Sequence, residues 1–147
     1  MDTGENIELQ EQAQKIIEEN RSLFEQSREI TDDLLANADI QNIGRYYKHL
    51  DKLTGIYGRL NVEYKKMRAL KKNEEARYFN SLKVTSSFNN ERFVAEVAKQ
   101  EASCYIAPLR TARDLLEGYV ESCTMAIGTC KSRIYEYRKD QHNETGA

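Results

Sequence analysis

The sequence predicts an all-α protein whose elongated helices carry coiled-coil-like apolar stripes, forming a helical bundle that homo-oligomerisation completes. Two observations predict this class. The chain has 147 residues with one Pro, seven Gly, no Trp and 31 % charged residues, a composition typical of long helices. Its apolar residues recur at alternating steps of three and four, which is the spacing of a helix-packing stripe. The low hydrophobic fraction of 39 % favours helices that share their core with another copy.

The first helix is expected from about Asn6 to Asn37, within an acidic segment at 1–38. Four apolar residues lie seven apart, with further apolar residues beside them and a densely acidic outer face: Leu9, Ile16, Leu23 and Ile30, widened by Ile17, Phe24, Leu34 and Leu35. Two interpretations stay open. The helix either packs antiparallel on the second helix and neutralises part of its charge, or it is an acidic arm for a basic partner.

The second helix is expected over 39–83 and is the element around which the chain is organised. Its apolar stripe is continuous: Ile43, Tyr46, Leu50, Leu53, Tyr57, Leu60, Tyr64 and Met67. Such a stripe requires cover from another helix, of this chain or of a partner. The residues assigned to contacts between copies are Ile43, Tyr46, Leu50, Leu53, Tyr57 and Leu60, together with Leu116, Tyr119, Ile127 and Ile134 in the last helix.

The rest of the chain is expected to be a loop followed by two helices, in a single domain over 1–147. Turn-forming residues at 84–90 predict the loop, with Asn90 as the N-cap of the next helix. Pro108 predicts a break or kink, because proline lacks the N–H and clashes with the preceding turn. Helix is expected over 90–140, with a stripe from Leu109 to Cys130, and a frayed tail over 141–147.

The charge is strongly segregated along the chain. Residues 1–42 carry eleven acidic and three basic side chains, whereas residues 43–85 carry four acidic and eleven basic ones. The basic residues concentrate where the apolar stripe ends and have aromatic neighbours: Lys65, Lys66, Arg68, Lys71, Lys72, Arg77, Tyr78 and Phe79. Cations with interleaved aromatics suit single-stranded nucleic acid, through phosphate contacts and base stacking. The alternative is that these cations simply solvate a long helix.

The sequence carries no motif of catalytic, metal-binding or phosphate-binding chemistry. Three Cys lack CxxC spacing, two His lack metal-ligand spacing, and no phosphate loop or nucleophile motif occurs, so neither an enzyme nor a cofactor is expected. The unpaired cysteines indicate a reducing, cytoplasmic location. The acidic N-terminus lacks the apolar run of a secretion signal, and no segment is apolar enough to span a membrane.

The sequence resembles the UvsY-type recombination mediators of T4-like phages over roughly 43–140. Tyr46-Tyr47-Lys48-His49-Leu50-Asp51-Lys52 is similar to the start of that family's long helix, and Lys71-Lys72 to Arg77-Tyr78-Phe79 is similar to its basic stretch. Near the C-terminus, Val120-Glu121-Ser122-Cys123 and Lys131-Ser132-Arg133 are similar to two further motifs of the family.

The resemblance implies a homo-oligomer that binds single-stranded DNA, helps to displace the single-strand-binding protein and loads a RecA-like recombinase, in a phage-infected bacterial cell. It places the family's DNA-contacting lysine on Lys72. The companion arginine falls on Glu74, a departure from the family, or on Arg77 after a small shift. The competing hypothesis is a structural coiled-coil adaptor or assembly chaperone without nucleic-acid binding, in which the acidic first helix pairs with Lys65 to Arg77.

Overall fold

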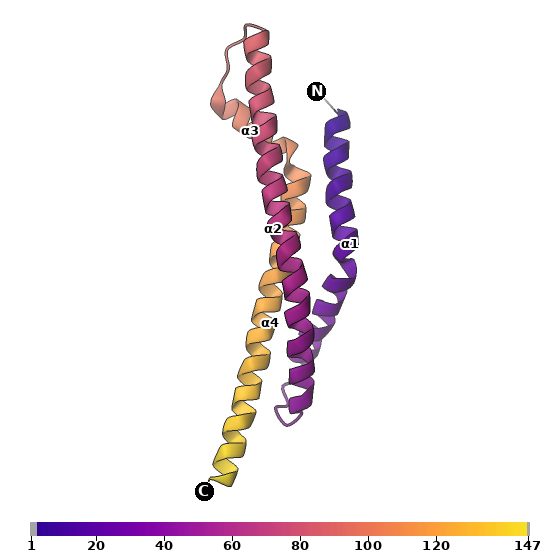
Figure 1. The fold of residues 1–147 in the computed structure, drawn as a ribbon, viewed down its shortest axis with the longest axis vertical. Helices are drawn as coiled ribbons and strands as arrows, with labels where there is room; N and C mark the ends of the chain where they lie inside the picture. Colours follow the sequence, from indigo (N-terminus) through magenta and orange to yellow (C-terminus); the bar gives the residue numbers. More distant parts are fainter. Residues whose placement is uncertain (1–2, 147) are drawn as a thin grey trace. The chain divides into compact units, whose positions relative to one another are not determined.

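The computed structural model describes residues 3–146, which form four helices and no strand. These are α1 (Thr3–Ala36), α2 (Ile43–Phe88), α3 (Ala95–Tyr105) and α4 (Ala107–Thr145) (Figure 1). The predicted all-α class is therefore confirmed. Within this described part, none of the helices combines the length and apolarity that a membrane span requires.

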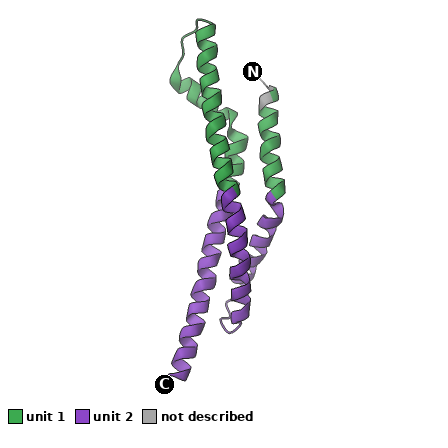
Figure 2. Ribbon diagram, in the orientation of Figure 1, with its two compact units in different colours: residues 1–19, 63–116 green, residues 20–62, 117–147 purple. Residues whose placement is uncertain are grey.

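The chain groups into two compact units, where the sequence suggests one domain. Unit 1 combines Met1–Glu19 with Glu63–Leu116, and unit 2 combines Asn20–Val62 with Glu117–Ala147 (Figure 2). Each unit is thus assembled from segments that are distant in sequence. The helices α1, α2 and α4 each supply residues to both units.

Unit 2 is a bundle of three helical segments, from α1, α2 and α4. The ring of Phe24 stacks on that of Tyr119, with centroids 4.2 Å apart, and the guanidinium of Arg133 reaches the carbonyl of Leu34 at 2.9 Å. Both contacts join α1 to α4 and advance together along the two helices, so α4 runs parallel to α1 here. The α1–α2 loop is held by the Tyr46 hydroxyl, which donates to the carbonyl of Asp39 at 2.9 Å.

The apolar stripe of α2 is covered by the chain's own helices. Every seventh residue is almost fully buried: Tyr46 (1 % exposed), Leu53 (0 %), Leu60 (0 %) and Met67 (1 %). The alternate positions Ile43, Leu50, Tyr57 and Tyr64 are half-buried. Burial of one such side chain is worth about 1.5–3 kcal/mol, so the stripe is a main source of stability within the single chain.

This burial corrects the assignment to contacts between copies for five of the ten residues, because they belong to the intramolecular core: Tyr46, Leu53, Leu60, Leu116 and Ile134. The other five are half-buried, and their assignment stays a prediction: Ile43, Leu50, Tyr57, Tyr119 and Ile127. The spacing identified an interface correctly, but spacing alone does not say whether the covering helix belongs to the same chain.

Unit 1 packs α3 and the beginnings of α1 and α4 around the second part of α2. Its buried side chains include Leu9, Met67, Tyr105 and Ile106. The stripe predicted from Leu109 to Cys130 has members in both units. All of them are buried except Tyr119, which is half-buried. In contrast, Leu35 is 86 % exposed, although the sequence suggested that it widens the buried face of the first helix.

The end of α2 differs from the prediction. Residues 84–88, expected as loop, continue the helix to Phe88. Asn90 is not an N-cap: it has φ 56° and follows the helix end, where its N–H donates to the Ser87 carbonyl (3.3 Å) and the Glu91 N–H donates to the Ser86 carbonyl (2.9 Å). This pair of bonds is a Schellman motif, in which Asn commonly adopts the left-handed conformation. The next helix therefore begins only at Ala95.

Pro108 breaks the helical pattern as predicted. α3 ends at Tyr105, and α4 begins at Ala107, so Pro108 sits in the first turn of α4, where a missing N–H is tolerated. The tail expected to fray from residue 141 is instead helical to Thr145, and Ala147 lies outside the described residues.

Candidate nucleic-acid interface

The second part of α2, within unit 1, carries the basic segment. Met67 anchors this part of the helix in the core and is 1 % exposed. Lys65, Arg68 and Lys72 are exposed and lie three and four residues apart, which places them on one face of the helix. They form no ion pair within the described part of the chain. We call these three residues the unpaired triplet.

The other three cations of the segment are paired with carboxylates of α2 itself. Lys66 lies 3.6 Å from Glu63, Lys71 lies 3.0 Å from Glu75, and Arg77 lies 2.9 Å from Glu74. We call Lys66, Lys71 and Arg77 the paired triplet. The partner of Lys66 precedes it by three residues, a spacing that brings two side chains together on a helix. Arg77 also donates to the Tyr105 hydroxyl at 3.3 Å.

The aromatic side chains of the segment are engaged inside unit 1. The ring of Tyr78 stacks on that of Tyr105, with centroids 4.1 Å apart and planes 12° apart. Phe79 meets Phe93 edge to face at 5.6 Å. Both Tyr78 and Phe79 are half-buried. The sequence hypothesis that they offer open stacking faces to bases is therefore corrected, because Tyr105 already covers one face of Tyr78.

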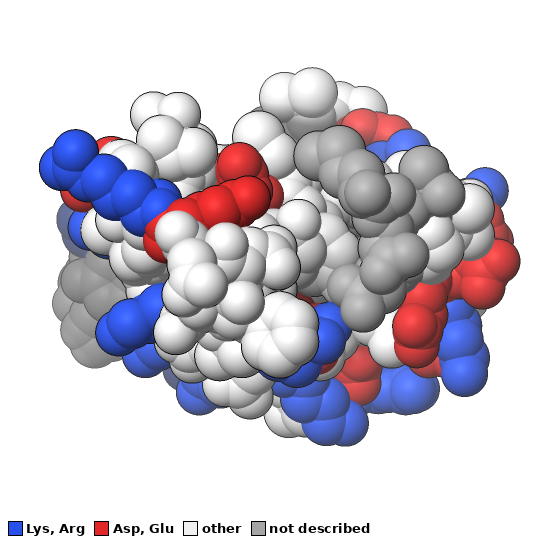
Figure 3. All heavy atoms as spheres, turned by 90° about the horizontal axis from the view of Figure 1, so that it is seen from above, with Lys and Arg blue, Asp and Glu red and all other residues white. Residues whose placement is uncertain are grey.

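Basic and acidic side chains lie close together on the face drawn in Figure 3. Lys and Arg gather along the lower rim of this face, with Asp and Glu among them. Two cations near the end of α4 are engaged within the chain, because Arg133 binds backbone carbonyls and Arg138 donates to the Tyr47 hydroxyl.

A polar cluster that the sequence analysis missed lies in unit 2. The carboxylate of Asp33 on α1 accepts from Arg45 and is 2.6 Å from Nε2 of His49, both on α2. Burial, and then the charges of Arg45 and Lys52, hold the pKa of His49 below its ordinary value. Because a carboxylate only accepts hydrogen bonds, the Nε2–H of His49 is the donor to Asp33. No spacing rule reveals this cluster, since its members meet only when the α1–α2 hairpin closes.

Metal ligands and cysteine thiols are the other groups that could carry chemistry. Over residues 3–146, no group of His, Cys, Asp and Glu side chains is arranged to hold a metal ion. Cys123 and Cys130 are buried, and burial raises the pKa of each thiol, which disfavours the reactive thiolate. They serve as small core residues.

Fold and surface together define a class: an all-α protein with a cationic helix face. Comparison with protein-family models, with curated proteins and with solved structures finds no match to this chain. Any more specific function therefore depends on the residues of the chain itself.

Proposed function

We propose that this protein binds single-stranded DNA through the unpaired triplet of α2 and acts as a recombination mediator. The observation that carries the proposal is the exposure of Lys65, Arg68 and Lys72 on one helix face, without carboxylate partners in the described residues. An ion-paired lysine must give up its partner before it binds a phosphate, whereas these three side chains are immediately available.

The electrostatic contribution should dominate binding. Each phosphate contact to a single strand releases a counterion, so three contacts give a salt dependence of about −2 in log K against log salt. Stacking on Tyr78 and Phe79 contributes less, because both rings already pack inside unit 1. The binding should consequently tolerate many sequences.

The mediator role comes from the resemblance to UvsY-type proteins. Lys72, which aligns with that family's DNA-contacting lysine, is exposed and belongs to the unpaired triplet, and this supports the proposal. Arg77 gains no such support as the companion residue, because Glu74 binds its guanidinium. In this role the protein would form a homo-oligomer, help to displace the single-strand-binding protein and load a RecA-like recombinase onto the strand.

Two triple variants with equal charge test the proposal. One replaces Lys65, Arg68 and Lys72 by Ala, and the other replaces the paired triplet by Ala. Both lose three positive charges, so a general charge effect is the same in each. Anisotropy of a labelled oligonucleotide, measured over a salt series, should show the greater loss of affinity and the flatter salt dependence for the first variant. Equal losses, or binding unaffected in both, would refute the assignment.

The adaptor hypothesis remains the second candidate, and one observation favours it. Val84 and Phe88 lie one helical turn apart near the end of α2 and are 68 % and 87 % exposed, which suits a protein contact. However, Lys66, Lys71 and Arg77 pair with Glu63, Glu75 and Glu74 on α2 itself, whereas that hypothesis expects the basic segment to pair with the acidic first helix. A mediator should stimulate recombinase assembly on coated single-stranded DNA, whereas an adaptor should not.

A further inference from the structure

The outward face of α4 in unit 2 carries exposed apolar side chains. Met125 is 75 % exposed and Tyr135 is 68 % exposed, although the opposite face of the same helix is packed, with Cys123, Ala126 and Cys130 buried. The core of unit 2 therefore does not use Met125 or Tyr135. Single exposed apolar side chains are common on protein surfaces, so these two indicate a contact only together with the spacing, hollows and charges of the same face.

Two glycines share this face. Gly118 and Gly128 both lie inside α4, where glycine destabilises a helix relative to alanine. A Cβ built on either residue would meet nothing within 4 Å. The same open space surrounds Gly55 and Gly58 on α2, so it does not by itself mark a contact. It means that a second helix has room to approach α4 closely at Gly118 and Gly128.

The order of these four residues is self-complementary. Gly118, Met125, Gly128 and Tyr135 are separated by steps of seven, three and seven residues, so reversing the helix direction leaves the spacing unchanged. When two α4 helices run antiparallel in this register, Met125 of each faces Gly128 of the other. Tyr135 of each likewise faces Gly118 of the other. Each Met125 and Tyr135 side chain then packs against a glycine of the other copy, in the manner of knobs-into-holes packing.

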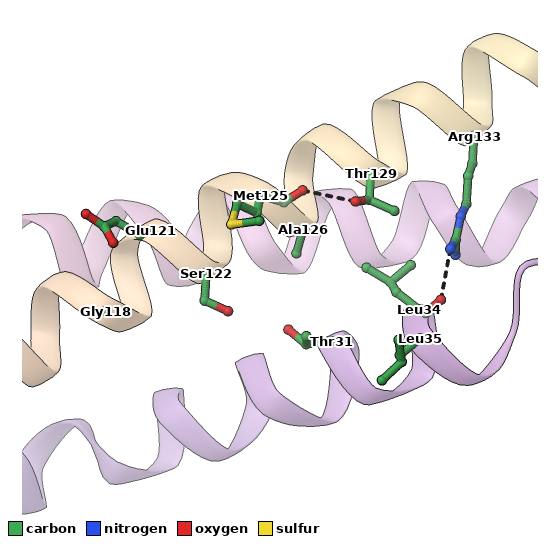
Figure 4. A pocket seen from close by; sticks show the side chains of 10 residues that line it. All are labelled: Thr31, Leu34, Leu35, Gly118, Glu121, Ser122, Met125, Ala126, Thr129 and Arg133. Atoms are coloured by element: carbon green, nitrogen blue, oxygen red, sulfur yellow. Dashed lines mark hydrogen bonds between the residues drawn. The ribbon is translucent and has the colours of Figure 1, made fainter.

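The surface beside Met125 is hollowed on both sides. A cavity of about 440 Å³ separates α4 from the end of α1. Figure 4 shows Ser122 and Thr31 on its opposite walls, with Arg133 reaching the backbone of Leu34. A second hollow, of about 500 Å³, lies along α4 between Met125 and Glu136 and includes Gly128 and Ser132. A Met125 side chain from another copy has space to enter it.

The charges fit the same antiparallel register. Glu121 of one copy faces Ser132 of the other, between Lys131 and Arg133. Glu121 and Lys131 are exposed and form no ion pair within the part of the chain that the structure describes, so the contact gains two symmetry-related pairs. The register also brings Glu117 opposite Glu136, which is a small like-charge cost at the edge of the face.

We propose that this face binds a second copy of the chain, through an antiparallel, two-fold symmetric contact between α4 helices. An isologous contact of this kind requires a patch that is complementary to itself, and the residues above form one. The face shares no residue with the stripes that the sequence analysis assigned to oligomerisation. It is also independent of the nucleic-acid proposal, since none of the basic residues of α2 takes part.

Sedimentation equilibrium of three glycine variants tests the contact. Gly128→Leu and Gly118→Leu fill the holes, while Gly55→Leu is the matched control, because Gly55 is also an exposed helix glycine of unit 2 with open space around it. The wild type and Gly55→Leu should form dimers. Filling either hole should raise the dimer dissociation constant about tenfold or more, without loss of helical circular dichroism. A monomeric wild type, or unchanged dimerisation of Gly118→Leu and Gly128→Leu, would overturn the proposal.

Cysteine pairing tests the orientation. In a Cys104→Ser background, which removes the exposed native thiol, a mixture of Glu121→Cys and Ser132→Cys chains should form a disulfide-linked dimer under mild oxidation. Glu121→Cys alone should not, because its two copies would lie about 16 Å apart along the helix axis. A strong cross-link of Glu121→Cys with itself would refute the antiparallel arrangement.

Discussion

Arg133 of α4 hydrogen-bonds to the end of α1, and replacing Arg133 should destabilise unit 2. Its guanidinium donates to the carbonyl of Leu34 at 2.9 Å and to that of Asn37 at 3.0 Å. Leu34 lies in the last turn of α1, where carbonyls lack an intrahelical partner and a cation also interacts favourably with the helix dipole. The same guanidinium lies 5.4 Å from the centroid of the Tyr46 ring.

The magnitude of the loss follows from these contacts. A hydrogen bond from a charged donor contributes about 1.5–3 kcal/mol, and two at the low end would give about 3 kcal/mol. Arg133 is only half-buried, so solvent screening reduces this value. We expect Arg133→Met, which keeps the aliphatic stem, to lower the free energy of unfolding by about 2 kcal/mol and the melting temperature by about 4–8 °C.

Urea unfolding followed by circular dichroism measures this change. Lys139→Met is the matched control, because Lys139 lies on the same helix, is exposed and forms no ion pair with the described residues. It also lies outside the proposed contact between copies. The midpoint should move to lower urea for Arg133→Met at an unchanged slope. A shift no larger than that of Lys139→Met would refute the reasoning, since the bonds to α1 would then contribute nothing.

Three further predictions address the core, a helix end and a titrating group. Leu60 is 0 % exposed, so Leu60→Ala should lower the free energy of unfolding by about 2–5 kcal/mol. The same urea titration checks it, and a loss under about 1 kcal/mol would contradict close packing there. Asn90 has φ 56°, so Asn90→Gly should melt at a higher temperature than Asn90→Ala, and equal melting temperatures would count against the left-handed conformation. Since the pKa of His49 is held below 6.5, the unfolded chain takes up this proton first and stability falls as pH drops below 6.5. His49→Gln should lose less free energy of unfolding than the wild type between pH 6.5 and about 5, and identical pH profiles would refute the role of His49.

The sequence predicts the helices well because their apolar spacing is regular. The seven-residue repeat of Tyr46, Leu53, Leu60 and Met67 identified the most buried positions of α2. It could not show that the cover is intramolecular, since a partner helix satisfies the same spacing. The end of α2 was misplaced because Asn90 suits both the start and the end of a helix, and only its backbone bonds decide between them.

The basic segment was also recognised, but its division into paired and unpaired residues was not fully predictable. The pairing of Lys66 with Glu63 follows a helical spacing of three and was open to sequence reasoning. The stacking of Tyr78 on Tyr105 joins residues 27 positions apart and depends on how α3 turns back on α2. Long-range contacts of this kind determine which side chains remain available at the surface.

The interleaved composition of the two units has a consequence for synthesis on the ribosome. All of unit 1 lies before Glu117, whereas unit 2 needs the segment Glu117–Ala147 to complete its bundle. Until those last codons are translated, the residues of α1 and α2 that α4 covers in unit 2 have no cover, and nascent apolar surface of this kind attracts chaperones and proteases. A premature stop codon after Leu116 should therefore yield a chain that the cell degrades rather than a smaller working protein.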